Sequence, residues 1–175
     1  MSKILRPSVE HLRGLGNFTQ GFRWGIVHTP PPGLKMNSEG LNFRAVSCGI
    51  PEWSSETMEI QIREFKSKQP GMTSIASPVP LEFFETEDNF VHEYFNAWKT
   101  LVVNTKKGYV IGAKAAYMTN MVVFRLNSMD EPIWKYEFGG VYPESVNKGQ
   151  LDAQTGEPLT IATNLAFNFF NDGPP

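Results

Sequence analysis

The sequence has few of the features that mark an exported, membrane-spanning or disulfide-stabilised protein. Its single cysteine, Cys48, cannot form a disulfide within the chain, so we expect a buried small side chain in a protein made in a reducing compartment. The first twenty residues carry charges throughout and lack the apolar run of roughly 7 to 15 residues that a secretion signal needs. No segment approaches the roughly 18 apolar residues that cross a bilayer. We therefore expect neither an export signal nor a membrane anchor.

The chain also lacks an excess of charge of one sign. It contains 16 Lys and Arg against 18 Asp and Glu, which gives a formal net charge of -2 and a pI near 5.9. Stable binding of nucleic acid needs a cluster of basic side chains that neutralises phosphates. The nearest approach to such a cluster in the sequence is the pair Lys106 and Lys107. The charge pattern therefore argues against a protein that holds nucleic acid tightly.

Catalytic and metal-binding patterns are missing as well. His11, His28 and His92 are scattered, and none of them stands in a recognisable setting with Cys48. His92 and Glu93 are neighbours on an expected helix, where adjacent side chains point in different directions and cannot chelate one ion. The glycines of GLGNFTQGFRWG lack the spacing and the Lys-Ser/Thr pair of a phosphate-binding loop. The sequence therefore predicts no enzyme, no cofactor and no metal site.

What the sequence does contain is alternation with a period of two, which is typical of half-buried strands. Strands are expected near residues 22–29, 41–48, 57–65, 81–85, 117–126, 133–138 and 159–169. In the third of these strands Met58, Ile60 and Ile62 alternate with polar residues, which predicts one face on a core and one in water. The stretch 66–80 contains three prolines and is predicted to be an extended loop or hairpin arm that leaves the body.

One helix is expected. Apolar residues between Phe90 and Val102 recur at helical spacing, and Glu87 and Asp88 precede them at the positive end of the helix dipole. Thr86 is predicted to accept a hydrogen bond from the first free amides. Together these elements predict a mainly β fold of two packed antiparallel sheets, a β-sandwich or small barrel with one flanking α-helix. Residues 1–20 are expected to form an N-terminal arm and residues 21–175 a single domain.

Two stretches resemble the tail tube proteins of contractile-tailed bacteriophages, a family that includes the inner tubes of contractile injection systems. The first is FRAVSCGIPEWSSETMEIQI, a strand followed by a turn with a small residue, an apolar residue and Pro. The second is YEFGGVYPESVNKGQLDAQTGEPLTIATNLAFNFF, in which a strand meets an apolar, aromatic, Pro corner before a final aromatic strand. The order of elements between them also fits the family.

The resemblance implies a subunit that forms hexameric rings, which stack helically into a hollow tube. That tube would conduct double-stranded DNA during ejection inside a contractile sheath. The implied partners are further copies of the chain, the tail sheath protein, and the baseplate and tail terminator proteins. The implied location is the virion tail, assembled in the host cytoplasm.

The same resemblance places the strands near 41–48, 57–65, 117–126 and 132–140 in a sheet that lines the lumen. The lumen-facing residues would be Glu59, Gln61, Arg63, Lys135 and Glu137. Contacts between subunits would come from the loop residues Lys66, Lys68, Gln69, Met72 and Ile75, and from the N-terminal arm.

Two alternatives stay open at the level of the sequence. The chain could be the inner-tube protein, or a tube-capping or baseplate protein, of a related contractile injection system. It could also be a monomeric β-barrel that binds a small ligand in an apolar cavity, in which case the charged strand faces are simply solvent-exposed.

Overall fold

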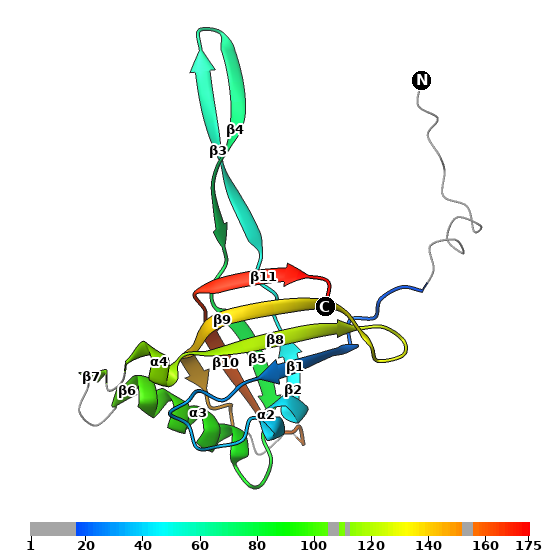
Figure 1. Cartoon of the computed structure of the whole chain (residues 1–175), viewed down its shortest axis with the longest axis vertical. Helices are drawn as coiled ribbons and strands as arrows, with labels where there is room; N and C mark the ends of the chain where they lie inside the picture. Colours follow the sequence, from blue (N-terminus) through cyan, green and yellow to red (C-terminus); the bar gives the residue numbers. More distant parts are fainter. Residues whose placement is uncertain (1–16, 105–108, 111–112, 152–155) are drawn as a thin grey trace.

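The structure is a computed structural model that describes residues 17–104, 109–110, 113–151 and 156–175. A compact body of strands carries one long helix on its flank, and a narrow hairpin projects far from that body (Figure 1). The strands of the body are β1 (Trp24–His28), β2 (Ala45–Cys48), β5 (Val79–Phe84), β8 (Thr119–Leu126), β9 (Pro132–Asn147), β10 (Thr160–Ala166) and β11 (Phe169–Gly173). The hairpin consists of β3 (Trp53–Ile62) and β4 (Phe65–Ile75), and a short pair of strands is formed by β6 (Val103–Asn104) and β7 (Tyr109–Val110). The helices are α2 (Glu39–Arg44), α3 (Phe90–Val102) and α4 (Lys114–Tyr117).

The seven strands of the body follow the order β1-β8-β9-β10-β5-β2, and β11 pairs with β9 outside this path. Every one of these pairings is antiparallel. The long strand β9 takes part in two layers, because its first half pairs with β8 and β11 and its second half pairs with β10. We call β1, β8, β11 and the first half of β9 the first sheet, and the second half of β9, β10, β5 and β2 the second sheet.

Strand β9 passes from the first sheet to the second at Gly139 and Gly140. Gly140 has a φ of 65°, a conformation that side chains with a Cβ rarely adopt, and an added Cβ would also overlap the side chain of Asn168. The backbone N–H of Asn168 donates a hydrogen bond of 2.9 Å to the Gly139 carbonyl, which fixes the return of the chain from β10 to β11. The expected corner after residue 140 is therefore a bend inside one continuous strand.

The core lies between the two sheets and α3. Tyr94, Phe95 and Trp98 of α3 are fully buried and pack with Phe83 of β5 and Phe138 of β9 in the same cluster. The Trp98 Nε1–H donates a hydrogen bond of 2.7 Å to the Tyr117 carbonyl, which ties α3 to the end of α4. The helix predicted over 90–102 is confirmed, as is the mainly β fold of two sheets.

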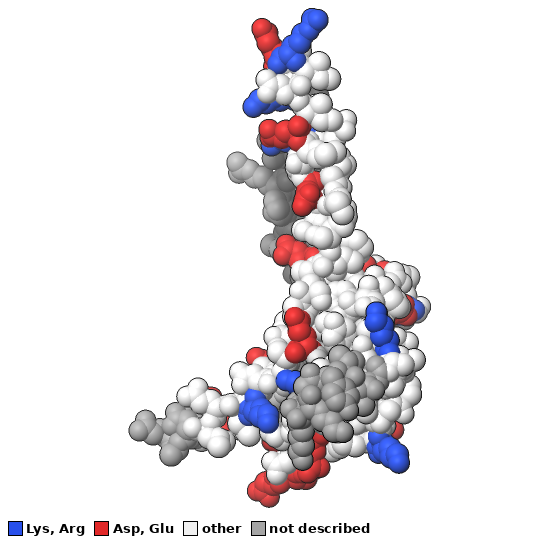
Figure 2. Space-filling view, turned by 90° about the vertical axis from the view of Figure 1, so that its left-hand side faces the viewer, with Lys and Arg blue, Asp and Glu red and all other residues white. Residues whose placement is uncertain are grey.

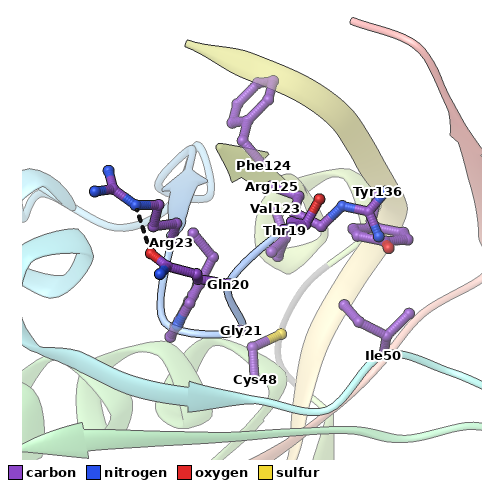
Figure 3. Close-up of a pocket in the computed structure, with 11 residues that line it drawn as sticks. Thr19, Gln20, Gly21, Arg23, Cys48, Ile50, Val123, Phe124, Arg125 and Tyr136 are labelled. Carbon is purple, nitrogen blue, oxygen red and sulfur yellow. Dashed lines mark hydrogen bonds between the residues drawn. The ribbon is translucent and has the colours of Figure 1, made fainter. Parts of the chain in front are cut away.

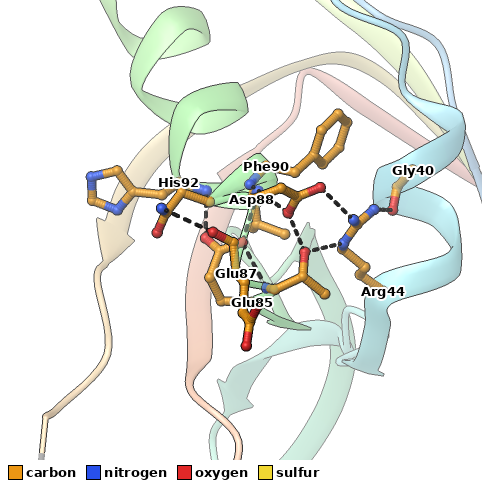
Figure 4. A network of polar contacts seen from close by, with 10 residues as sticks. Gly40, Arg44, Glu85, Glu87, Asp88, Phe90 and His92 are labelled. Atoms are coloured by element: carbon orange, nitrogen blue, oxygen red, sulfur yellow. Dashed lines mark hydrogen bonds and ion pairs between the residues drawn. The ribbon is translucent and has the colours of Figure 1, made fainter.

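The residue predicted to cap the start of this helix, Thr86, was wrong. The carboxylate of Glu85 accepts hydrogen bonds from the backbone N–H groups of Val91 and His92, at 3.1 and 2.8 Å (Figure 4). Thr86 instead accepts a hydrogen bond from Arg44 Nε at 3.0 Å and donates one to Asp88. Because the chain folds back before α3 begins, a carboxylate five residues upstream reaches the free amides better than Thr86 does.

Two strand predictions need correction. Residues 41–44 belong to helix α2, and only 45–48 form a strand, because the backbone N–H groups of Leu41 and Asn42 both donate to the Ser38 carbonyl. The expected alternation therefore fails, and Leu41 is buried while Phe43 is 88% exposed. The expected last strand, 159–169, is two strands in different sheets, β10 and β11.

The hairpin of β3 and β4 confirms the predicted arm but not its packing. Within the part of the chain that the structure describes, its strands pair only with each other, from Trp53 opposite Ile75 to Ile62 opposite Phe65. Every residue of β3 is exposed, so the expectation that this strand covers a core with one face is wrong for the single chain. We refer to β3 and β4 together as the arm.

Candidate functional site

The outer half of the arm has one apolar face and one polar face. The register places Met58, Ile60 and Ile62 of β3 on the same face as Phe65 of β4. We call these four residues the arm stripe. All four are exposed, Ile62 to 69% and Phe65 to 81%. A lone two-stranded hairpin is marginally stable in water. Four exposed apolar side chains on one face of such a hairpin therefore indicate an interaction site for another surface.

The other face of the arm is polar. Lys68 and Glu59 lie opposite each other with Nζ and Oε1 3.5 Å apart, and Gln61 lies opposite Lys66. Charges of both signs occur along the arm and gather at its tip (Figure 2). This face is therefore suited to stay in contact with water while the arm stripe is buried.

The inner half of the arm separates the stripe from the body. Ser54 pairs with Ser74 through a hydroxyl hydrogen bond of 2.9 Å, and Ser55 pairs with Thr73 through one of 3.1 Å. Between Ser55 and Thr57 the register shifts by one residue. The apolar stripe therefore begins only beyond a polar base, at a distance from the subunit's own core.

The predicted lumen residues fall into two groups. Glu59, Gln61 and Arg63 lie on the arm, whereas Lys135 and Glu137 lie on β9 in the first sheet. Of the four strands predicted to share one lumen sheet, only 117–126 and 132–140 do so, because 45–48 belong to the second sheet and 57–65 to the arm. Which of these residues line a lumen stays a prediction.

The predicted inter-subunit residues of the loop all lie on β4, whereas residues 1–16 of the predicted N-terminal arm lie outside the described residues. Lys66, Lys68, Gln69 and Met72 are exposed on the arm, whereas Ile75 packs against the subunit's own core at the arm's base. The apolar residues of the facing strand were missed as contact residues, because their alternation resembles that of a strand on its own core.

The outer face of the first sheet carries paired charges. Lys135 Nζ lies 3.0 Å from Glu137 Oε1, and Asn171 Nδ2 of β11 donates to Glu137 Oε2 at 3.4 Å. These hydrogen bonds, first from Lys135 and then from Asn171, hold the pKa of the Glu137 carboxyl below its usual value. The exposed side chain of Val27 on β1 shares this face. The face therefore has balanced charge and mixed polarity.

A cavity of about 290 Å³ opens beside the start of β1 (Figure 3). Trp24, Cys48, Ile50, Arg125 and Tyr136 are among its lining residues. Burial raises the pKa of the Cys48 thiol to about 12, so the thiol is protonated and unreactive at neutral pH. The cavity therefore offers no activated nucleophile. Within the described residues, no group of three His, Cys, Asp or Glu side chains is placed to hold a metal ion.

A second hollow, of about 700 Å³, lies between β1 and β2, the two ends of the strand path. We call it the edge groove. Its lining residues are Gly21, Phe22, Trp24, Gly25, Ile26, Asn42, Ala45, Val46, Ser47, Cys48 and Phe84. Helix α2 bridges the two strands at one end, where Ser38 Oγ donates to the His28 carbonyl and Asn42 Oδ1 accepts from the His28 N–H.

The two-sheet body and its projecting amphipathic hairpin place the chain in the class of mainly β proteins built from two packed antiparallel sheets. Residues 25–171 match the phage tail tube protein family, and the chain belongs to this family. The family resemblance read from the sequence is thereby confirmed, and so is the prediction of a structural protein rather than an enzyme. No curated protein matches the chain.

Solved structures share the fold at low sequence identity. The tube-terminating cap of the anti-feeding prophage is 13% identical, with a TM-score of 0.63 over 91% of this chain and 93% of that chain. A chain from the sheath-tube complex of an extracellular contractile injection system, PVC, in its extended state is 12% identical, with a TM-score of 0.63 over 97% and 100%. Hcp1 from Flavobacterium johnsoniae is 12% identical, with a TM-score of 0.52 over 87% and 95%. In the part of the chain that the structure describes, no helix is long and apolar enough to cross a membrane.

Proposed function

We propose that this protein is the repeating subunit of a tail tube, in which hexameric rings stack helically into a hollow conduit inside a contractile sheath. The observation that carries the proposal is the open first sheet. Among the described residues, β1 and β11 each pair on one side only. A sheet with two open edges recruits further strands by backbone hydrogen bonding.

The directions of these edge strands favour ring closure. The path from β1 through β8 and β9 to β11 contains three antiparallel pairings, so β1 and β11 run in opposite directions. Strand β1 of one copy can therefore pair with β11 of the next in the antiparallel sense. One heterologous contact of this kind, repeated by rotation, closes a ring and leaves no free edge.

In such a ring the outer face of the first sheet would line the bore. Lys135 and Glu137 neutralise each other there, so the wall offers no cluster of cations to hold phosphates. Double-stranded DNA could then slide through without stable binding. Glu59, Gln61 and Arg63 would contribute to the bore where the polar face of the arm continues it.

The proposed partners are further copies of the chain, a tail sheath protein around the tube, and baseplate and terminator proteins at its ends. The particle would be a virion tail assembled in the host cytoplasm. Supporting structures with this fold come from a sheath-tube complex, a sheath/tube terminator and a baseplate. A second candidate is a tube cap, which the likeness to the anti-feeding prophage cap favours.

Negative-stain microscopy and light scattering of the purified protein test these proposals. A tube subunit should give stacked rings or tubes, whereas a cap should give single rings that do not stack. A uniform monomer of the chain's own mass, 19.7 kDa, at every protein concentration would reject both and support the monomeric β-barrel.

A further inference from the structure

We infer that the turn between β8 and β9 of one ring seats Met129 in a hollow at the opposite end of the first sheet in the next ring. This inference rests on the proposed function, because it names a contact by which one ring holds the next. The hollow has a volume of about 270 Å³ and lies beside the end of β1 and the start of β8. We call it the proline hollow. Its lining residues are Thr29, Pro30, Pro32, Met118, Thr119, Asn120 and Gly140.

The direction of the strands brings these two surfaces together in a stack. In a ring closed through β1 and β11, the first sheet runs round the bore, and its strands cross from one face of the ring to the other. The β8–β9 turn, residues 127–131, lies at one end of these strands, and the proline hollow lies at the other end (Figure 1). Head-to-tail stacking therefore points the turns of one ring at the hollows of the next.

The two surfaces also lie at a similar distance from the axis of the ring, because both belong to the first sheet. A rotation of one ring against the next about that axis can therefore bring every turn over a hollow at the same time. The turn and the hollow are different surfaces of identical copies, so the contact is heterologous. Repeated along the axis, such a contact builds a filament.

The turn holds Met129 in a defined and exposed position. Asn127 Oδ1 accepts hydrogen bonds from the backbone N–H groups of Met129 and Glu131, at 2.8 and 2.9 Å. Asp130 forms a salt bridge of 2.8 Å with Arg23 across the turn. The side chain of Met129 is 78% exposed. A turn that is already ordered loses little conformational entropy when it docks.

The proline hollow is held in shape by hydrogen bonds of its own. The Thr29 N–H donates to the Asn120 carbonyl at 3.2 Å, and Thr119 Oγ1 donates to the Thr29 carbonyl at 2.6 Å. These bonds fix the chain after β1 against the start of β8. The hollow is therefore formed before any partner arrives.

The chemistry of the two surfaces matches. None of the lining residues of the hollow carries a charge, and two prolines and a methionine supply apolar atoms. A methionine side chain is flexible and fills irregular apolar spaces well. The carboxylates of the turn already have partners in their own subunit, Asp130 with Arg23 and Glu131 with Asn127. Docking therefore buries the apolar tip without burying a free charge.

Negative-stain microscopy and sedimentation of full-chain variants test this contact. Met129→Glu places a carboxylate where the hollow offers no charged partner, so rings should persist but stack poorly. The protein concentration needed for tubes should rise at least about tenfold, because losing one buried apolar side chain removes at least the free energy of a tenfold change. Met129→Leu keeps an apolar side chain of similar size and should form tubes as the wild type does.

A second substitution tests whether the turn and the hollow meet. Asn120 is exposed and lines the hollow, so Asn120→Lys adds a cation there. Combined with Met129→Glu it should restore tubes, because the two opposite charges would meet across the junction between rings. Asn171→Lys is the matched control, because it adds the same charge at an exposed position of β11 outside the hollow. It should not restore tubes.

The possible outcomes separate this contact from the proposed function. Normal tubes from Met129→Glu would overturn the contact and leave the tube subunit in place, as would equal rescue, or no rescue, by both lysine variants. Loss of rings or of the folded circular dichroism spectrum in Met129→Glu would also overturn it, because Met129 would then act within the ring or within the subunit. A wild-type protein that forms neither rings nor tubes would reject the proposed function itself.

Discussion

At the scale of single residues, His28 is the most unusual side chain of the core. It is buried on β1, and the centre of its ring lies 4.9 Å from that of Trp98. Among the described residues, neither of its ring nitrogens has a hydrogen-bond partner. Burial lowers its pKa from 6.5 to about 3. The folded protein therefore holds this imidazole neutral over a range in which an unfolded chain would protonate it.

This burial predicts a loss of stability in acid. As the pH falls below about 6.5, the unfolded state binds a proton that the folded state cannot bind, so the free energy of unfolding decreases until the pH approaches about 3. The loss over the whole window is on the order of a few kcal/mol. His28→Phe keeps an aromatic ring and removes the titration, so it should flatten this part of the profile.

Denaturant unfolding of the wild type and of His28→Phe between pH 7 and pH 4 measures the effect. Carboxylates titrate in both proteins, so the difference between the two profiles isolates His28. Parallel profiles would show that the imidazole already finds a proton or a partner in the folded state.

At the scale of elements, the carboxylate of Glu85 caps two amides at the start of α3, and that of Asp88 accepts a hydrogen bond from a third, the Phe90 N–H, at 3.3 Å. Glu85→Ala leaves the Val91 and His92 amides without their side-chain acceptor, and the free energy of unfolding should fall by about 1–2 kcal/mol. Glu87→Ala removes a carboxylate of the same charge at a neighbouring exposed position. It should cost much less in the same chemical denaturation experiment, and equal losses would mean that charge alone, rather than capping, stabilises this end.

The bend in β9 gives a second test at this scale. Gly140→Ala forces a side chain into a left-handed backbone conformation beside Asn168 and should cost about 1–2 kcal/mol or more. Gly25→Ala is the matched control, because its new methyl group meets no atom within 4 Å. Thermal unfolding should show a lower midpoint for Gly140→Ala alone, and unchanged midpoints for both would contradict a required glycine.

Sequence patterns predicted the elements in which apolar residues recur with the period of the helix or strand itself. Helix α3 and strand β8 are of this kind, because their buried side chains recur at the expected spacing, whereas β1 was predicted from its aromatic and β-branched content. The patterns failed where distant contacts decide the structure. Arg44 of α2 reaches Asp88 across 44 positions, and no local rule indicates that pair. The stripe on β3 alternates like a core strand, because alternation shows that a face will be covered and not which molecule covers it.

At the scale of the whole molecule, the arm separates folding from assembly. All of the residues buried in the core cluster lie outside the outer half of the arm. Replacing residues 57–70 by a short turn should therefore leave the body folded, with near-native stability and an unchanged circular dichroism spectrum apart from the lost strands.

The same deletion should abolish polymerisation in sedimentation experiments, because it removes the whole arm stripe. The matched control keeps the full-length arm and replaces Gln61 and Lys66, on its polar face, by Ser. Tubes of normal length from the deletion protein would show that the arm makes no contact needed for assembly. Unfolding of that protein would show that the body does not fold independently of the arm.

The passage of β9 through both sheets also has a mechanical consequence. A force applied to the first sheet reaches the second along the covalent backbone at Gly139 and Gly140. Its transmission therefore does not rely on the packing contacts between the two layers. In a tube driven forward by a shortening sheath, each subunit would thus transmit thrust as one rigid piece. Yielding should then begin at the junctions between neighbouring copies rather than inside any one of them.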